Sequence, residues 1–162
     1  MSIYKWIDGD VPSELPVKQV YGIVFSEDGR ILLKKDGEHY SLAGGKPETF
    51  DKNMEDTLKR EFLEEVNISI SNAVMVGYQL VDEQNGIPLY AQVRMTAKIA
   101  RIGDRQPDPD SGKTYERLLV PPKRAAELLN WGDVGQVQIL SAVKIARAFL
   151  GLHSFSEMEQ SV

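Results

Sequence analysis

One stretch of this 162-residue chain has a helical periodicity that brings acidic side chains to the edge of an apolar stripe. At about 100° per residue, residues 53–66 form a helix with apolar and charged sides. Its apolar stripe consists of Met54, Leu58, Phe62 and Val66. Glu61 and Glu65 border this stripe instead of lying opposite it. The helix must therefore pack against another layer, and two carboxylates accompany its buried face.

The glutamates of this helix are crowded, because Glu61 and Glu65 form an i, i+4 pair of like charges and Glu64 lies beside both. Partial burial of such a cluster without a counter-charge would cost several kcal/mol or force protonation. Mg²⁺ and Mn²⁺ prefer carboxylate oxygens. The pattern therefore indicates either a divalent-metal site or a solvated acidic surface. Arg60 would accordingly either orient the carboxylates or form a surface salt bridge.

Strand-forming segments occupy much of the remaining chain. Strands are expected at residues 17–25, 30–35, 39–43, 72–84, 89–102 and 114–120. Asp28-Gly29 and Asn85-Gly86 predict two hairpins among them. Two further helices are expected at residues 123–131 and from about Val134 to Gly151. Hairpins combined with three helices predict an α+β fold, a mixed sandwich and not a regularly alternating parallel sheet.

Composition limits the class of protein. The length suits a single domain over residues 1–162, with an N-terminal extension over about 1–16 and a frayed tail over about 152–162. A net charge of −5 disfavours a nucleic-acid polymer or an acidic membrane as partner. The absence of Cys excludes disulfides and thiolate chemistry and suits a reducing cytosol. No signal-peptide core or membrane-spanning run occurs, so we expect a soluble, cytoplasmic protein.

A glycine pair, Gly44-Gly45, lies between the third expected strand and the acidic helix. Glycine permits tight backbone geometry and the close approach of a ligand. Lys46 follows directly and could contact phosphate. A glycine turn alone is weak evidence, but a glycine turn followed by an acidic helix is a much more specific pattern.

The strand over residues 89–102 has one apolar face and one polar face. The polar face carries Tyr90, Gln92, Arg94, Thr96 and Lys98. The first three of these could stack on or hydrogen-bond a base or a sugar, although the wet side of a sheet is the commoner reading. Near the N-terminus, Tyr4 and Trp6 could cover a pocket or meet a second copy, which leaves a homodimer open.

Residues 44–68 resemble the Nudix hydrolase signature, G-x5-E-x7-R-E-U-x-E-E-x-G-U, in which U is a bulky aliphatic residue. The second half is matched by residues 60–68, REFLEEVNI, with two departures. Phe62 stands at an aliphatic position, and Asn67 replaces the final glycine. Asn is the non-glycine residue that best tolerates a left-handed helix end, so we expect the helix to end there.

The first half of the signature fits less closely. Counted from Gly45, Asp51 stands where the first Glu belongs, but eight residues separate it from Arg60 instead of seven. Either the loop carries a one-residue insertion or Lys52 occupies the Glu position.

The resemblance implies an α/β/α sandwich with a mixed sheet and hydrolysis of a diphosphate linkage in a small-molecule nucleoside diphosphate joined to another group. It implies that Mg²⁺ or Mn²⁺ is bound by Glu61, Glu64, Glu65 and the backbone of Gly45, and that Arg60 orients the carboxylates. A divalent ion lowers the charge of the phosphates and the pKa of an attacking water.

The group that accepts the proton of this water is Glu61 or Glu64 if it lies within the motif. Glu116 is the candidate outside the motif, and its alternative reading is an exposed strand residue. Asp108 and Asp110 read as solvated loop residues.

Two other functions remain alternatives. A Nudix-like regulatory domain would bind a nucleotide or metabolite without cleaving it, and the complete acidic cluster disfavours this function. A diphosphate isomerase related by fold would resemble a family that uses a catalytic Cys, which this chain lacks.

Overall fold

Strands outnumber helices in this chain, and both types of element follow the expected order closely. The computed structural model describes residues 1–162. The elements are β1 (Ile3–Asp8), β2 (Val17–Phe25), β3 (Ile31–Asp36), β4 (His39–Ser41), β5 (Gly44–Gly45), α1 (Met54–Val66), β6 (Ile68–Ile70), β7 (Val74–Asp82), β8 (Tyr90–Ile102), β9 (Glu116–Val120), α2 (Pro122–Leu129), α3 (Asp133–Phe149) and β10 (Gln160–Ser161).

The strands form one mixed sheet in the order β1-β7-β8-β2-β3-β9-β10, while β4, β5 and β6 pair with β3, β2 and β8. The β2–β8 pair is parallel, and the other pairs are antiparallel. The two predicted hairpins, β2–β3 and β7–β8, are both confirmed. No helix of the chain is long and apolar enough to cross a lipid bilayer.

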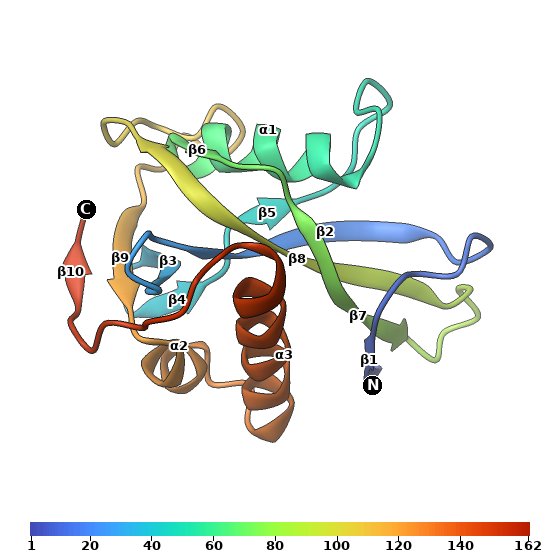
Figure 1. Cartoon of the computed structure of the whole chain (residues 1–162). Helices are drawn as coiled ribbons and strands as arrows, with labels where there is room; N and C mark the ends of the chain where they lie inside the picture. Colours follow the sequence, from blue (N-terminus) through green and yellow to red (C-terminus); the bar gives the residue numbers. More distant parts are fainter.

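Helices cover both faces of the sheet, with α1 on one face and α2 and α3 on the other (Figure 1). Leu58 and Phe62 of α1 are fully buried in the same core cluster as Leu32 of β3. The second cluster joins Phe25 of β2 to Ile139 of α3. Each fully buried side chain of this size contributes about 1.5–3 kcal/mol. The α/β/α prediction is therefore confirmed, and each face has its own apolar core.

Both ends of the chain are integrated into the sheet. β1 pairs with β7 along its whole length, so the expected extension contributes an edge strand. At the other end β10 pairs with β9, the ring of Phe155 packs edge-on against Phe25 at 6.1 Å, and Ser156 N–H donates to the carbonyl of Asp28. The prediction of a frayed tail over residues 152–162 was therefore wrong, because apolar and backbone contacts hold this segment.

The polar face of β8 is also not the wet side of the sheet. Arg94 is 4% exposed and Thr96 is fully buried. This face lies under α3, whose Gln138 accepts a hydrogen bond from Arg94. The commoner reading of these side chains as solvated is therefore wrong.

Helix α1 begins and ends as its sequence predicts. The side chain of Asn53 caps the first turn by accepting from Asp56 N–H at 2.9 Å. The helix ends at Asn67, which is left-handed with φ 51° and ψ 48°, and whose N–H donates to the carbonyl of Leu63. Asn67 Nδ2 also donates to the carbonyl of Asp104 at 2.9 Å. The cap thus joins the helix end to the loop after β8.

We expect Asn67→Ala to lower the free energy of unfolding by about 1–2 kcal/mol, because Ala tolerates the left-handed conformation poorly and cannot replace the side-chain hydrogen bond. Asn67→Gly should be close to neutral, since backbone relief offsets the lost bond. Urea unfolding checks both values. Asn130→Gly, at the left-handed C-cap of α2, isolates the backbone effect. A marked loss of stability in Asn67→Gly would contradict the cap argument.

Candidate active site

Arg60 lies at the centre of a hydrogen-bonded network of charged side chains at the surface of α1, the Arg60 network. Its Nε and Nη2 donate to the two oxygens of Asp51 at 3.0 and 2.9 Å, which is a bidentate pair. Nη1 donates to Glu61 Oε1 at 3.0 Å and to Glu64 Oε2 at 3.3 Å. Nη2 also donates to the carbonyl of Lys46 at 3.0 Å. One guanidinium therefore fixes the glycine loop and two of the predicted carboxylates together.

Asp51, and not Lys52, is the residue before the helix whose side chain pairs with Arg60. Besides Arg60, it accepts from Thr57 Oγ1 and from Glu48 N–H, each at 2.9 Å. The hydrogen bond from Arg60 holds the pKa of Asp51 well below its usual range, so it is ionised. Lys52 contributes only its backbone N–H, to Asp56. The loop thus absorbs one extra residue, and Asp51 anchors Arg60.

The carboxylate of Glu65 lies next to the backbone of the glycine pair. Gly44 N–H donates to its Oε1 at 2.8 Å, and Lys34 Nζ lies 2.6 Å from its Oε2. The two side chains of this ion pair are 10% and 14% exposed. Burial raises the pKa of Glu65, and Lys34 opposes this increase. The sequence did not single out Lys34. It lies two residues after Leu32, so the two side chains are on the same face of β3, and Leu32 is buried beneath α1.

Glu61 is confined between its neighbours and the glycine loop. A Cβ added to Gly45 would lie 2.6 Å from the carboxyl carbon of Glu61. Any residue other than glycine at position 45 would therefore displace this carboxylate. Glu61 and Glu65 are each 8% exposed, as the helical periodicity predicted. Burial raises the pKa of Glu61 to about 7, helped by the charges of Glu65 and Glu64 and opposed by Arg60. The positive charges nearby do not fully compensate this carboxylate.

The predicted ligands lie close together along α1 but do not converge on one point. No three acidic or histidine side chains in the chain are arranged to hold a metal ion. Arg60 engages Glu61 and Glu64, whereas Lys34 engages Glu65. The donor set still has the right chemistry for a hard divalent cation, because it consists of carboxylate oxygens, and burial, followed by the charges of Glu65 and Glu64, raises the pKa of Glu61.

Of two other acidic residues, Glu116 is an exposed strand residue, which was its alternative reading, and Asp108 differs from expectation. Glu116 pairs in register with Lys35 and contacts it at 3.9 Å. Side chains alternate along a strand, so Glu116 points away from the face on which Lys34 meets Glu65. It therefore lies apart from the carboxylates. Asp108, expected to be solvated, is buried and accepts from Asp110 N–H and Ser111 Oγ, which orders its loop.

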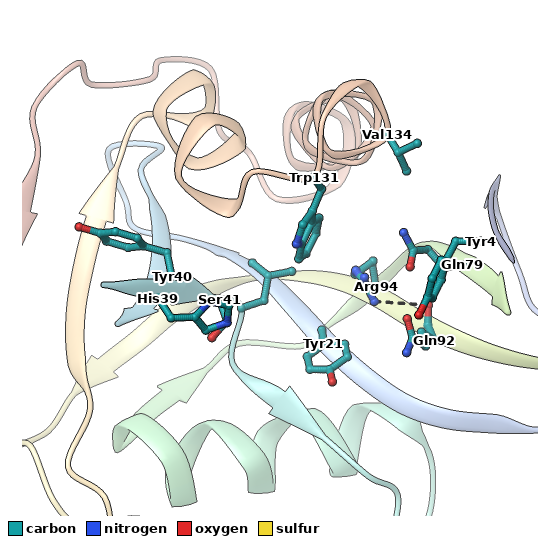
Figure 2. A pocket seen from close by; sticks show the side chains of 11 residues that line it. Tyr4, Tyr21, His39, Tyr40, Ser41, Gln79, Gln92, Arg94, Trp131 and Val134 are labelled. Carbon is teal, nitrogen blue, oxygen red and sulfur yellow. Dashed lines mark hydrogen bonds between the residues drawn. The ribbon is translucent and has the colours of Figure 1, made fainter. Parts of the chain in front are cut away.

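A cavity of about 540 Å³ lies on the face of the sheet that α3 covers, and Tyr21 in its lining pairs in register with Gly44. Its lining residues include Tyr4, Tyr21, Gln79, Gln92, Arg94 and Trp131 (Figure 2). Of the predicted substrate contacts, Gln92 and Arg94 line this cavity, whereas Tyr90 does not. Lys46 is exposed, and its backbone carbonyl accepts a hydrogen bond from Arg60. Tyr21 and Trp131 were missed, since nothing in their local sequence distinguishes them from core aromatics.

A family model described as the NUDIX domain matches residues 15–140. No curated protein matches the chain. Among solved structures, the Bacillus subtilis pyrophosphohydrolase BsRppH has a TM-score of 0.67 at 18% identity, covering 90% of this chain and 91% of its own.

Two further solved structures show the same fold. The MutT protein from Bacillus halodurans has a TM-score of 0.54 at 19% identity, covering 75% of this chain and 78% of its own. The Escherichia coli dihydroneopterin triphosphate pyrophosphohydrolase has a TM-score of 0.52 at 11% identity, covering 81% and 99%. These similarities agree with the family match in the arrangement of the sheet and its helices.

Proposed function

The chain belongs to the Nudix family of pyrophosphohydrolases, and from this premise we propose that it hydrolyses, with a divalent metal ion, the diphosphate linkage of a nucleoside diphosphate joined to a further group. The observation that carries the proposal is the Arg60 network, which fixes Glu61 and Glu64 beside the glycine pair. A single domain spans residues 1–162 in this proposal, with the matched region extended by edge strands at both ends.

Mg²⁺ or Mn²⁺ would be held by carboxylates of Glu61, Glu64 and Glu65, with the backbone of Gly45 close by. When bound, such an ion neutralises phosphate charge and lowers the pKa of a coordinated water. The fit rests on the crowding of Glu61, whose pKa is raised to about 7 by burial and by its acidic neighbours. A cation relieves this repulsion.

Residues of the chain orient the carboxylates and accept the proton of the attacking water. Arg60 orients Glu61 and Glu64 through the same Nη1, and Asp51 holds Arg60 in place by two hydrogen bonds. Glu61 or Glu64 accepts the proton of the attacking water, and Glu64 is the more accessible, with its side chain 28% exposed. Gly44 N–H and Lys34 hold the carboxylate of Glu65 in position.

The test is a hydrolysis screen over nucleoside diphosphate compounds that differ in base and in attached group, with Mg²⁺, Mn²⁺ or EDTA. The expected result is metal-dependent release of a nucleoside monophosphate from a subset of the panel. Tight binding of one compound without cleavage of any would overturn the proposal. That outcome would favour the alternative of a regulatory Nudix domain that binds a nucleotide or metabolite.

A further inference from the structure

Arg94 is a buried cation in the wall of the cavity beside the candidate active site. It is 4% exposed, and its guanidinium carbon lies 5.1 Å from the ring centres of both Tyr21 and Trp131. Its Nε donates to Oε1 of Gln138, which is fully buried on α3. Figure 2 shows the guanidinium between the two rings, beside Gln92. The position of Arg94 is thus fixed by aromatic rings and one amide.

No carboxylate compensates this charge, since Arg94 forms no ion pair in the chain. Burial raises the pKa of Tyr21, so its phenol is neutral and supplies no counter-charge. Burial lowers the pKa of Arg94 to about 10, which leaves it charged at neutral pH. Cation–π contacts offset part of the cost of an unpaired buried guanidinium. The remaining hydrogen-bonding capacity of the guanidinium is open to the cavity, where a ligand can use it.

The N–H groups of Arg94 that remain free are on its two terminal nitrogens, Nη1 and Nη2. Nη1 makes one long contact, at 3.5 Å, with the carbonyl of Gln92, and Nη2 has no acceptor in the protein. Each terminal nitrogen carries two hydrogens, so a parallel pair of donors stays available. Such a pair matches a planar group that presents two adjacent acceptors.

The cavity lies two strands away from the glycine pair. Tyr21 is the register partner of Gly44 on one side and of Arg94 on the other. Neighbouring strands are about 4.8 Å apart, so the backbone of Arg94 lies about 10 Å from the glycine pair. A volume of about 540 Å³ is sufficient for a nucleoside, and Trp131 and Tyr21 supply faces for a flat ring.

We infer that Arg94 is a specificity residue that binds the O6 and N7 acceptors of a 6-oxopurine in the substrate. Guanine and hypoxanthine present these two acceptors side by side, which is the pattern that an Arg fork matches. Adenine presents N7 beside an amino donor, which opposes the N–H groups of Arg94. Uracil and thymine present no such pair, and cytosine presents one only on its N3–O2 edge. The inference rests on the proposed function, since it places the base of a nucleoside diphosphate compound in this cavity.

Binding of nucleoside monophosphates by the wild-type protein in EDTA tests the inference without any turnover. Calorimetry should show that GMP and IMP bind at least about tenfold more tightly than AMP. 7-Deaza-GMP, which lacks the N7 acceptor, should lose most of this preference. Equal binding of GMP and AMP, or full retention of affinity by 7-deaza-GMP, would overturn the assignment.

Variants identify the residue responsible. Arg94→Met should abolish the preference for GMP over AMP, and Arg94→Lys, which keeps the charge without the fork, should restore it only in part. Arg147→Met is the matched control, because Arg147 also lies over an aromatic ring, Phe155 at 4.8 Å, but outside the cavity. Equal weakening of GMP and AMP by Arg94→Met would show a phosphate contact and overturn the inference.

Failure of this inference is distinguishable from failure of the proposed function. Equal cleavage of guanosine and adenosine diphosphate compounds would sustain the hydrolase and overturn the base preference. GMP-selective binding together with a silent hydrolysis screen would sustain the base site and overturn the hydrolase.

Discussion

Glu64→Gln is expected to lower kcat by about 10²-fold or more, while the free energy of unfolding stays within about 0.5 kcal/mol of wild type. Glu64 is the most accessible of the three clustered glutamates, and its side chain makes one hydrogen bond in the protein, accepted from Arg60 at 3.3 Å. Gln keeps the size of the side chain and can accept the same hydrogen bond. It cannot accept a proton from water, and it is a weaker ligand for a hard cation.

The control for this variant is Glu127→Gln on α2. Glu127 accepts from Arg124 Nη1 at 3.2 Å, so it forms an equivalent glutamate–arginine contact on a helix remote from the glycine loop. Steady-state hydrolysis of the best compound of the screen, together with urea unfolding, compares the two variants. Full activity in Glu64→Gln would refute the assignment of Glu64 to metal binding or catalysis.

Periodicity predicted the burial of the glutamates on α1, because a helix fixes the angle between its residues. The stripe that contains Leu58 and Phe62 determined which glutamates would be buried, and Glu61 and Glu65 are buried to the same extent. Asn67 also followed from local conformation alone. Such features depend on neighbours in sequence, so they need no knowledge of the tertiary structure.

The contacts that complete the site join segments far apart in sequence, and local patterns carried little information about them. Lys34 meets Glu65 only because β3 lies beneath α1. The choice between Asp51 and Lys52 depended on loop geometry, which spacing alone could not decide. The burial of Arg94 depended on the packing of α3 over β8, which turned a polar face into the wall of a cavity.

The C-terminal tail shows the same limit. Its position at the end of the chain suggested fraying, but Phe155 packs against Phe25, and β10 extends the edge of β9. An exposed strand edge provides unpaired N–H and carbonyl groups, and a short segment can pair with them whatever its side chains. Position in the sequence alone therefore underestimated the order of this segment.

Glu61→Gln is expected to stabilise the metal-free protein by about 1–2 kcal/mol at pH 8, while abolishing hydrolysis. Burial raises the pKa of Glu61 from 4.5 to about 7, so at pH 8 the folded protein holds a carboxylate that burial disfavours. Between these two pKa values the folded state binds more protons than the unfolded state. The contribution of Glu61 to the free energy of unfolding therefore falls as the pH rises through this window.

The neutral amide of Gln removes this pH-dependent penalty, although it weakens the contact with Arg60. Urea unfolding at pH 5 and pH 8, in EDTA and in Mg²⁺, measures the difference. In EDTA, the advantage of Glu61→Gln over wild type should be larger at pH 8 than at pH 5. Mg²⁺ should stabilise wild type more than the variant, because a bound cation compensates the carboxylate in wild type alone. A variant less stable than wild type at both pH values, with an unchanged response to Mg²⁺, would contradict the argument that Glu61 is strained by its site and relieved by metal.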